Sequence, residues 1–193
     1  MSRIDLALTT TADAWLDVVL ANFDNFLSDH ASCEKKASGM ALSIASHYPD
    51  KPQLLNAMAE LAVEELSHYR EVVRLLTQRG GTPGADTKDP YINALNATIR
   101  KGPQHYLLDR LLIAAVVERR GHERFTLLAG ALDNDPLGNF YRAIAASEDR
   151  HWQLFIDLAE THCDRSAIPA RLECLIMTEA QLVSTLPIQP RLH

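Results

Sequence analysis

Apolar and polar residues alternate along most of this chain in steps of three and four, which is the repeat of an amphipathic helix. Proline and glycine are concentrated between long stretches rich in Ala, Leu, Glu and Arg, and strand patterns are nearly absent. The predicted helices span 12–47 with a break or bend near Asn22, 51–79, 103–132, 136–163 and 167–185, with a shorter helical piece within 90–100. The sequence therefore predicts an all-α protein.

The connections between these helices differ in length. The run Gly80-Gly81-Thr82-Pro83-Gly84 ends the second long helix, and the connection continues to Gly102-Pro103, whereas the other joins are short. One long crossover is typical of a ferritin-like bundle, because a simple up-down-up-down bundle needs only short loops. We therefore predict one ferritin-like four-helix bundle domain over 1–193, with one long crossover connection and additional flanking helices, among them 167–185.

Charged residues interrupt the apolar stripes of the four long helices near their middles. They are Glu34, Glu65, His68, Glu118, Glu148 and His151. The second and fourth long helices carry a Glu-x-x-His pattern, and the first and third carry a single glutamate. Glu34 precedes Glu65 by 31 residues and Glu118 precedes Glu148 by 30, so each helical hairpin places one glutamate opposite one Glu-x-x-His.

Four carboxylates converging in an apolar core would destabilise the fold unless cations compensated their charge. Helical residues three apart point the same way, so one turn supplies both a carboxylate oxygen and an imidazole. Glutamates from two helices combined with Glu-x-x-His from two others form the ligand set of di-iron and di-manganese bundles. We predict a di-iron centre on the six residues; the ligand types leave manganese open and disfavour zinc.

Two further histidines, His30 and His122, lie one helical turn from Glu34 and Glu118 on the same faces. We expect them to support the ligands or to be satisfied core histidines. In the alternative interpretation, the six ligand residues are ion pairs on helix surfaces. Their position in the middle of apolar stripes favours the metal centre.

Carboxylate oxygens stabilise high oxidation states, and two irons can share the electrons needed to cleave O–O, so this ligand set suits oxygen activation. Several other ferritin-like functions stay open: a rubrerythrin-like oxidase or peroxidase, a manganese catalase and an iron-storage protein. The chain contains no Cys-x-x-Cys pair for the rubredoxin-type iron of many rubrerythrins. A metal-free structural bundle is the remaining alternative.

The composition also bears on the cellular compartment and on the partners that we expect for the protein. No segment approaches the roughly 18 uninterrupted apolar residues of a membrane span, and the N-terminus lacks a secretory pattern. The chain has three cysteines, Cys33, Cys163 and Cys174. Their odd number and wide spacing do not match a disulfide framework or a thiolate metal site, so we interpret them as reduced thiols. We expect a soluble cytoplasmic protein without a membrane partner. The net charge of −6 provides no general attraction to nucleic acid.

Four runs of the chain resemble the bacterial tRNA hydroxylases that act on 2-methylthio-N6-isopentenyladenosine, the MiaE family. They are HASCEKKASGMALSIASHYPD, VEELSHYREVVRLLTQRGG, DRLLIAAVVERRGHERF and FYRAIAASEDRHWQLFIDLA. The resemblance extends from about Trp15 to Cys163. In that family the first glutamate of the first and third runs and the Glu-x-x-His of the second and fourth bind iron. The resemblance therefore implies the same six ligands.

The resemblance also implies an activity. It is that of a non-haem di-iron monooxygenase, which uses O2 as co-substrate and two electrons to hydroxylate the isopentenyl group of the modified adenosine next to the tRNA anticodon. The implied partners are tRNA and an electron-donor protein or reductase. The implied cofactors are two iron ions.

A tRNA substrate requires local basic clusters on this acidic chain, because phosphate contacts supply much of the affinity for nucleic acids. The candidate substrate-binding residues are Lys35, Lys36, Arg100, Lys101, Arg119, Arg120 and Arg124. The alternative for each is a solvated helix face. Arg119 and Arg120 could equally support the metal-binding carboxylates.

Overall fold

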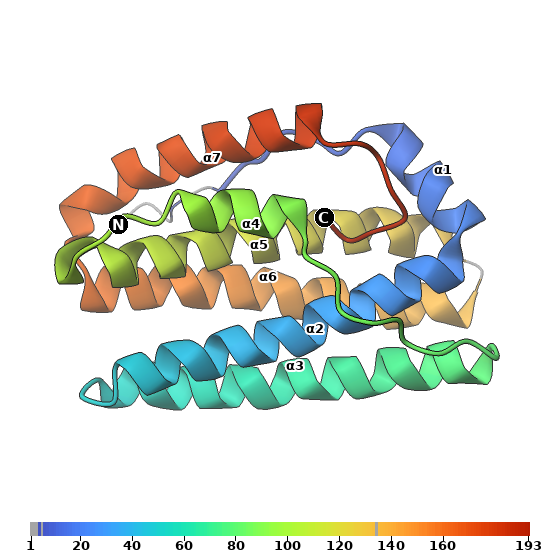
Figure 1. Ribbon diagram of the computed structural model, residues 1–193, viewed down its shortest axis with the longest axis horizontal. Coiled ribbons are helices and arrows are strands. Elements are labelled where there is room, and N and C mark those ends of the chain that lie inside the picture. Colours follow the sequence, from blue (N-terminus) through green and yellow to red (C-terminus); the bar gives the residue numbers. More distant parts are fainter. Residues whose placement is uncertain (1–3, 5, 134) are drawn as a thin grey trace. The chain divides into compact units, whose positions relative to one another are not determined.

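The computed structural model describes residue 4, residues 6–133 and residues 135–193 of the chain. Its helices are α1 (Asp13–Ala21), α2 (Phe23–His47), α3 (Pro52–Gln78), α4 (Pro90–Ala97), α5 (Pro103–Ala131), α6 (Pro136–His162), the 3-10 helix η1 (Arg165–Ala167) and α7 (Ile168–Thr185) (Figure 1). The described residues form no strand. The predicted helices are thus confirmed, and the expected bend near Asn22 is the break between α1 and α2.

Local sequence explains where the helices begin. A proline occupies the first position of α3, α4, α5 and α6, where its missing N–H costs no helical hydrogen bond. Asp89 caps α4 by accepting from Tyr91 N and Ile92 N, and Asp135 caps α6 by accepting from Leu137 N. After α3, Gly80 adopts a φ of 84°, a conformation that glycine reaches without steric cost.

The chain forms two compact units. The α2–α3 unit comprises 14–87 and 188–192 and contains α1, α2 and α3. The α5–α6 unit comprises the described residues up to Asp13 together with 88–187 and His193, and contains α4 to α7. Our expectation that residues 1–193 form a single domain stays a prediction.

In the α2–α3 unit, the two long helices pack against each other as an antiparallel hairpin. Phe26 and Met58 are among the fully buried core residues. The hydroxyl of Ser38 donates to the Ala62 carbonyl at 2.9 Å and sets the register between the helices. Trp15 of α1 packs edge-on against Phe26, with ring centroids 6.1 Å apart. The core therefore consists of apolar side chains from all three helices of this unit.

In the α5–α6 unit, α5 and α6 pack along their length, and α4 and α7 pack against α5. A fully buried ion pair joins Arg120 Nε of α5 to Glu179 Oε1 of α7 at 2.7 Å. The Tyr91 hydroxyl of α4 donates to the same oxygen at 3.1 Å. Arg120 also donates to Thr11 Oγ1 and to the Thr9 carbonyl. This polar network ties three helices and the N-terminal segment together.

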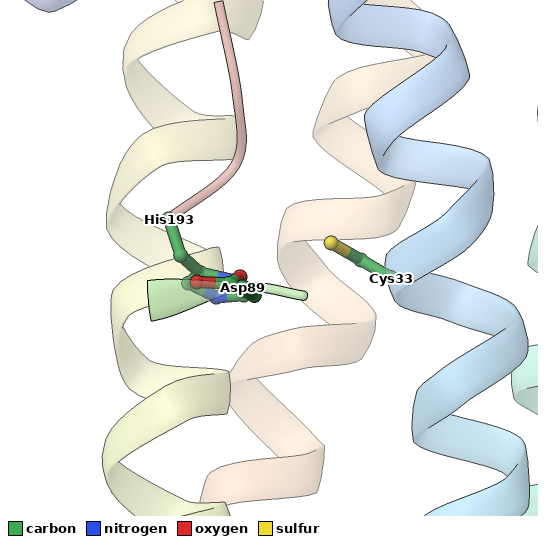
Figure 2. A group of neighbouring side chains, drawn as sticks. All are labelled: Cys33, Asp89 and His193. Carbon is green, nitrogen blue, oxygen red and sulfur yellow. The ribbon is translucent and has the colours of Figure 1, made fainter. Parts of the chain in front are cut away.

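The residue His193 lies beside the start of α4 in this unit. Its ring stacks on Tyr91, with centroids 5.0 Å apart and an interplanar angle of 4°. Its Nδ1 lies 3.4 Å from Asp89 Oδ2, and Figure 2 shows the two side chains side by side. Burial raises the pKa of Asp89, but the His193 imidazole and the backbone N–H groups of α4 lower it below its ordinary value. The contact therefore packs His193 on the first turn of α4.

A second buried carboxylate, that of Asp109 in the N-terminal part of α5, accepts hydrogen bonds from two arginines. Arg100 Nη2 donates to it at 2.6 Å and Arg171 Nε of α7 at 2.9 Å. Burial raises the pKa of Asp109, but the hydrogen bonds from both arginines lower it below its ordinary value. Asp109 is therefore ionised and ties the end of the crossover and α7 to α5.

We expect Asp109→Asn to lower the free energy of unfolding at pH 7 by about 2–4 kcal/mol, because it leaves two guanidinium groups without their carboxylate. The folded-state pKa is lowered, so this stabilisation is present above the unfolded pKa of about 4 and is lost as the pH falls through the folded value. Urea unfolding of the wild type and the variant at pH 7 and pH 3 measures the difference. Asp157→Asn, at an exposed position of α6, is the control. A difference that stays constant with pH would contradict the assignment.

No helix in the described part of the chain is both long and apolar enough to cross a membrane.

Candidate metal centre

The α2–α3 half-site consists of Glu34, Glu65 and His68. His68 Nδ1 lies 3.7 Å from Glu34 Oε2 and 3.5 Å from Glu65 Oε2. Both glutamates are buried. The structure thus brings together the three predicted ligands of the first helical hairpin.

The antiparallel packing of α2 on α3 explains why these three side chains lie close together. Ser38 of α2 contacts Ala62 of α3. Because the helices run in opposite directions, the residue one turn before Ser38 faces the residue one turn after Ala62. These residues are Glu34 and Glu65. The helix period places His68 on the next turn of the same face of α3.

Hydrogen bonds and charges orient the groups of this half-site. His30 Nε2 lies 2.6 Å from Glu34 Oε1, and both side chains are buried. Burial raises the pKa of Glu34, but the hydrogen bonds with His30 and His68 hold it well below its usual range. Burial lowers the pKa of His68, but Glu34 and Glu65 raise it to about 10. Without a metal ion, a protonated His68 supplies positive charge beside the carboxylates.

The α5–α6 half-site consists of Glu118, Glu148 and His151 and repeats this arrangement. His151 Nδ1 lies 3.9 Å from Glu118 Oε2 and 3.9 Å from Glu148 Oε2, and all three side chains are buried. His122 differs from His30 in its partner. Its Nδ1 lies 2.8 Å from the Ala145 carbonyl of α6, so this half-buried histidine contacts the helix backbone instead of a ligand carboxylate at that atom.

Gly121 is a residue of this half-site that the sequence analysis missed. A Cβ atom at this position would lie 3.5 Å from Glu148 Oε2. A glycine within a long helix costs about 1 kcal/mol relative to alanine, and this irregularity in α5 was the available signal. Gly121 therefore lies beside the Glu148 carboxylate, at a distance where an added methyl group would make an ordinary van der Waals contact.

Each half-site has the donors that iron prefers, two carboxylates and one imidazole. Two ligand atoms on one ion, each about 2.1 Å from it, lie at most about 4.2 Å apart. The nitrogen-to-oxygen distances of 3.5–3.9 Å are within this limit in both half-sites. The residues therefore fit a metal ion in each half-site.

Several of the basic residues predicted to bind RNA lie at the surface. Lys35 Nζ donates to Asp86 at 2.8 Å, and Lys36 Nζ donates to the Thr87 carbonyl at 2.9 Å. Both lysines and Lys101 are exposed. These three remain available to a large partner.

The four predicted arginines are more deeply placed. Arg100 is partly exposed and pairs with Asp109, and Arg119 donates to the Leu6 carbonyl at 3.1 Å. Arg120 is fully buried. Arg124 is also buried, which lowers its pKa to about 10. The prediction that Arg120 and Arg124 contact RNA is corrected, because their side chains lie in the interior of their unit.

Comparison with known proteins places the chain in a family. A family model described as tRNA-(MS[2]IO[6]A)-hydroxylase (MiaE) matches residues 1–193. The chain belongs to the MiaE family. This confirms the family resemblance seen in the four sequence runs.

Two curated proteins are similar to this MiaE family member, and both are named tRNA 2-(methylsulfanyl)-N(6)-isopentenyladenosine(37) hydroxylase. The one from Pseudomonas putida is 35% identical over 183 residues, which cover 95% of this chain and 89% of the relative. The one from Salmonella typhimurium is 32% identical over 141 residues, which cover 73% of this chain and 52% of the relative. The match thus covers most of this chain in both cases.

One solved structure shares the fold closely. It is described as protein 43 with aldehyde deformylating oxygenase activity from Synechococcus, and it matches with a TM-score of 0.91 and 34% sequence identity. The match covers 98% of this chain and 96% of the other. It confirms the predicted all-α, ferritin-like fold class.

Proposed function

We propose that the two half-sites together form one di-iron centre that serves O2-dependent hydroxylation of the isopentenyl group of 2-methylthio-N6-isopentenyladenosine in tRNA. Its ligands are Glu34, Glu65, His68, Glu118, Glu148 and His151. The observation that carries the proposal is the repetition of one arrangement in two helical pairs. In each pair, an imidazole nitrogen lies within 3.9 Å of carboxylate oxygens from two helices.

The side chains have separate tasks in this centre. The bound iron pair supplies the activation of O2. The four carboxylates would bind it and balance its charge, and His68 and His151 would complete the ligand set. His30 holds the orientation of Glu34 through their 2.6 Å contact. Glu34 and Glu65 raise the pKa of His68 to about 10, so the imidazole would have to lose a proton to serve as a ligand.

The overall reaction balances with one molecule of O2, two electrons and two protons. One oxygen atom enters an allylic C–H bond to form an alcohol, and the other leaves as water. An allylic C–H bond is comparatively weak and is therefore a suitable target. The electrons come from a separate electron-donor protein or reductase.

The family relatives support tRNA as the substrate, since both curated proteins are named as hydroxylases of this tRNA nucleoside. Lys35, Lys36 and Lys101 are exposed and provide positive charge for phosphate groups. The partly exposed side chains of Arg100 and Arg119 can add to them. An enzyme with this substrate works in the cytoplasm, where tRNA is modified.

Mass spectrometry of tRNA nucleosides tests the proposal. The iron-loaded protein is incubated with O2, a reductant and tRNA that carries the isopentenyl nucleoside. We expect that nucleoside to gain one oxygen atom, derived from labelled O2, and the gain to be absent without oxygen. An iron-loaded, reduced protein that adds no oxygen would reject the hydroxylase.

Aldehyde deformylation is a second candidate, favoured by the Synechococcus structure with 34% identity over 98% of this chain. The same protein preparation should be offered an aldehyde in place of tRNA. Loss of the formyl group with no oxidation of tRNA would favour this candidate over the hydroxylase.

A further inference from the structure

A polar pocket of about 310 Å³ lies in the α2–α3 unit, away from the half-site of that unit. Three pieces of chain line it: the first half of α2, the segment 84–87 of the crossover and the segment 189–191. The lining side chains that can form hydrogen bonds include Asn25, Ser28, Ser32, Thr87, Gln189 and Arg191. The volume falls at the lower end of the usual range for small-molecule sites.

Hydrogen bonds hold the crossover segment against α2. Ser28 Oγ accepts from Gly84 N at 2.8 Å. Asp86 accepts from Ser32 Oγ at 2.9 Å and from Lys35 Nζ at 2.8 Å. This side of the pocket is therefore built by specific contacts.

The opposite side is held in a similar way. Asp29 Oδ2 accepts from Leu192 N at 2.9 Å, and Trp15 Nε1 donates to the Arg191 carbonyl at 2.8 Å. Two segments about a hundred residues apart in sequence thus meet the same helix. The pocket exists because both are fastened to α2.

The pocket offers groups that match the edge of a nucleic-acid base. The side-chain amides of Asn25 and Gln189 are exposed and form no hydrogen bond within the described part of the chain. Each amide provides both a donor and an acceptor, which is the combination that reads an adenine edge. Ala85 and Pro190 add apolar surface for the flat face of a base.

Two cationic side chains lie at the pocket, Arg191 in its lining and Lys36 beside it, together with the carboxylate of Asp29. The Lys36 ammonium donates to the carbonyl of the lining residue Thr87 at 2.9 Å, and its charge also helps to lower the pKa of Asp86. Arg191 Nε is 3.9 Å from Asp29 Oδ1, a distance too long for a hydrogen bond. Within the described part of the chain, neither cation donates a hydrogen bond to a carboxylate, so both have N–H donors to offer a phosphate group.

We propose that this pocket binds one nucleotide, with its base against Asn25 and Gln189 and its phosphate against Lys36 and Arg191. Ser32 of the pocket and Glu34 of the half-site are two residues apart on α2, so they point about 200° apart. A helix about 10–12 Å wide separates the two sites. If the proposed tRNA function holds, the pocket therefore takes a nucleotide that flanks the hydroxylated one.

Binding measurements test this site without relying on activity. Fluorescence anisotropy with an anticodon stem-loop RNA that carries the isopentenyl nucleoside, and calorimetry with free AMP, distinguish an RNA nucleotide from a mononucleotide. The variants are the double change Asn25→Ala with Gln189→Ala, and Lys36→Ala. The matched controls are Asn56→Ala and Lys51→Ala, at other surface positions of the same unit.

We expect the double variant to weaken binding of the ligand by about tenfold, the effect of losing two or more hydrogen bonds. Lys36→Ala should weaken stem-loop binding. It should also make the slope of the logarithm of the binding constant against the logarithm of the salt concentration shallower by about one. The controls should bind like the wild type. Wild-type binding of AMP without stem-loop binding would retain the nucleotide site and argue against the tRNA function. Stem-loop binding that is equal in all five proteins, or no binding of either ligand, would overturn the site and leave the hydroxylase assay as an independent test.

Discussion

The Glu118→Ala variant should lose hydroxylation of tRNA by roughly 1,000-fold or more while keeping its helical content. Loss of a group that only orients a metal ligand already costs about 10- to 100-fold, and Glu118 is proposed as a ligand itself. Removing a buried carboxylate does not disturb the apolar contacts of α5, so circular dichroism should remain close to that of the wild type. Product formation and iron content are measured together. Full activity in this variant would contradict the assigned role of Glu118.

The same experiment on α3 tests whether the half-sites form one centre. Glu65→Ala removes a proposed ligand of the α2–α3 half-site, and Glu71→Ala removes an exposed glutamate from the same helix as the control. For a shared di-iron centre, Glu65→Ala and Glu118→Ala should each abolish activity and the magnetic coupling between the two irons. Glu71→Ala should retain both.

Two independent mononuclear sites would give a different result. Each ligand variant would then lose the iron of its own half-site and keep an unchanged spectrum from the other. No magnetic coupling would be seen in the fully loaded wild type. Mössbauer spectroscopy of iron-57 protein separates these outcomes without using tRNA.

The Glu179→Ala variant should lower the free energy of unfolding by about 3–5 kcal/mol, because it leaves the fully buried Arg120 guanidinium without its α7 partner. It also removes the acceptor of the Tyr91 hydroxyl. For a protein of this size the loss corresponds to a decrease in Tm of roughly 6–20 °C. Thermal and urea unfolding of the metal-free protein measure it.

Glu173→Ala, at an exposed position of the same helix, is the control and should change stability by less than about 0.5 kcal/mol. Adding Arg120→Met to Glu179→Leu removes both charges of the pair. This double variant should be more stable than Glu179→Ala, in which the buried Arg120 guanidinium keeps only Glu123 as a carboxylate partner. A Glu179→Ala variant as stable as the control would show that the buried pair contributes little.

The helices and the meeting of the candidate ligands within each hairpin could be predicted because both depend on local properties of the sequence. The period of apolar residues determines which face of a helix is buried, and proline with aspartate marks where α4 and α6 begin. Glu65 and His68 share a face for the same reason. Their sequence positions relative to Glu34 also indicate the pairing, since a short loop makes α2 and α3 neighbours.

The surroundings of the basic residues could not be predicted in this way. Arg119 and Arg120 are adjacent in sequence, yet Arg119 is partly exposed while Arg120 is fully buried. The difference arises because Arg120 meets Glu179, 59 residues further along the chain. Helix periodicity indicates the direction of a side chain but does not identify the segment that covers it.

The sequence by itself therefore determined the helices, their order and the six candidate ligands, since each follows from residue spacing within a helix or a hairpin. Only the tertiary structure decided that Arg120 and Arg124 are interior residues, that Gly121 lies beside Glu148, and that a pocket lies on α2. These features depend on contacts between segments far apart in the chain. Such contacts are set by packing and buried hydrogen bonds, which no local pattern specifies.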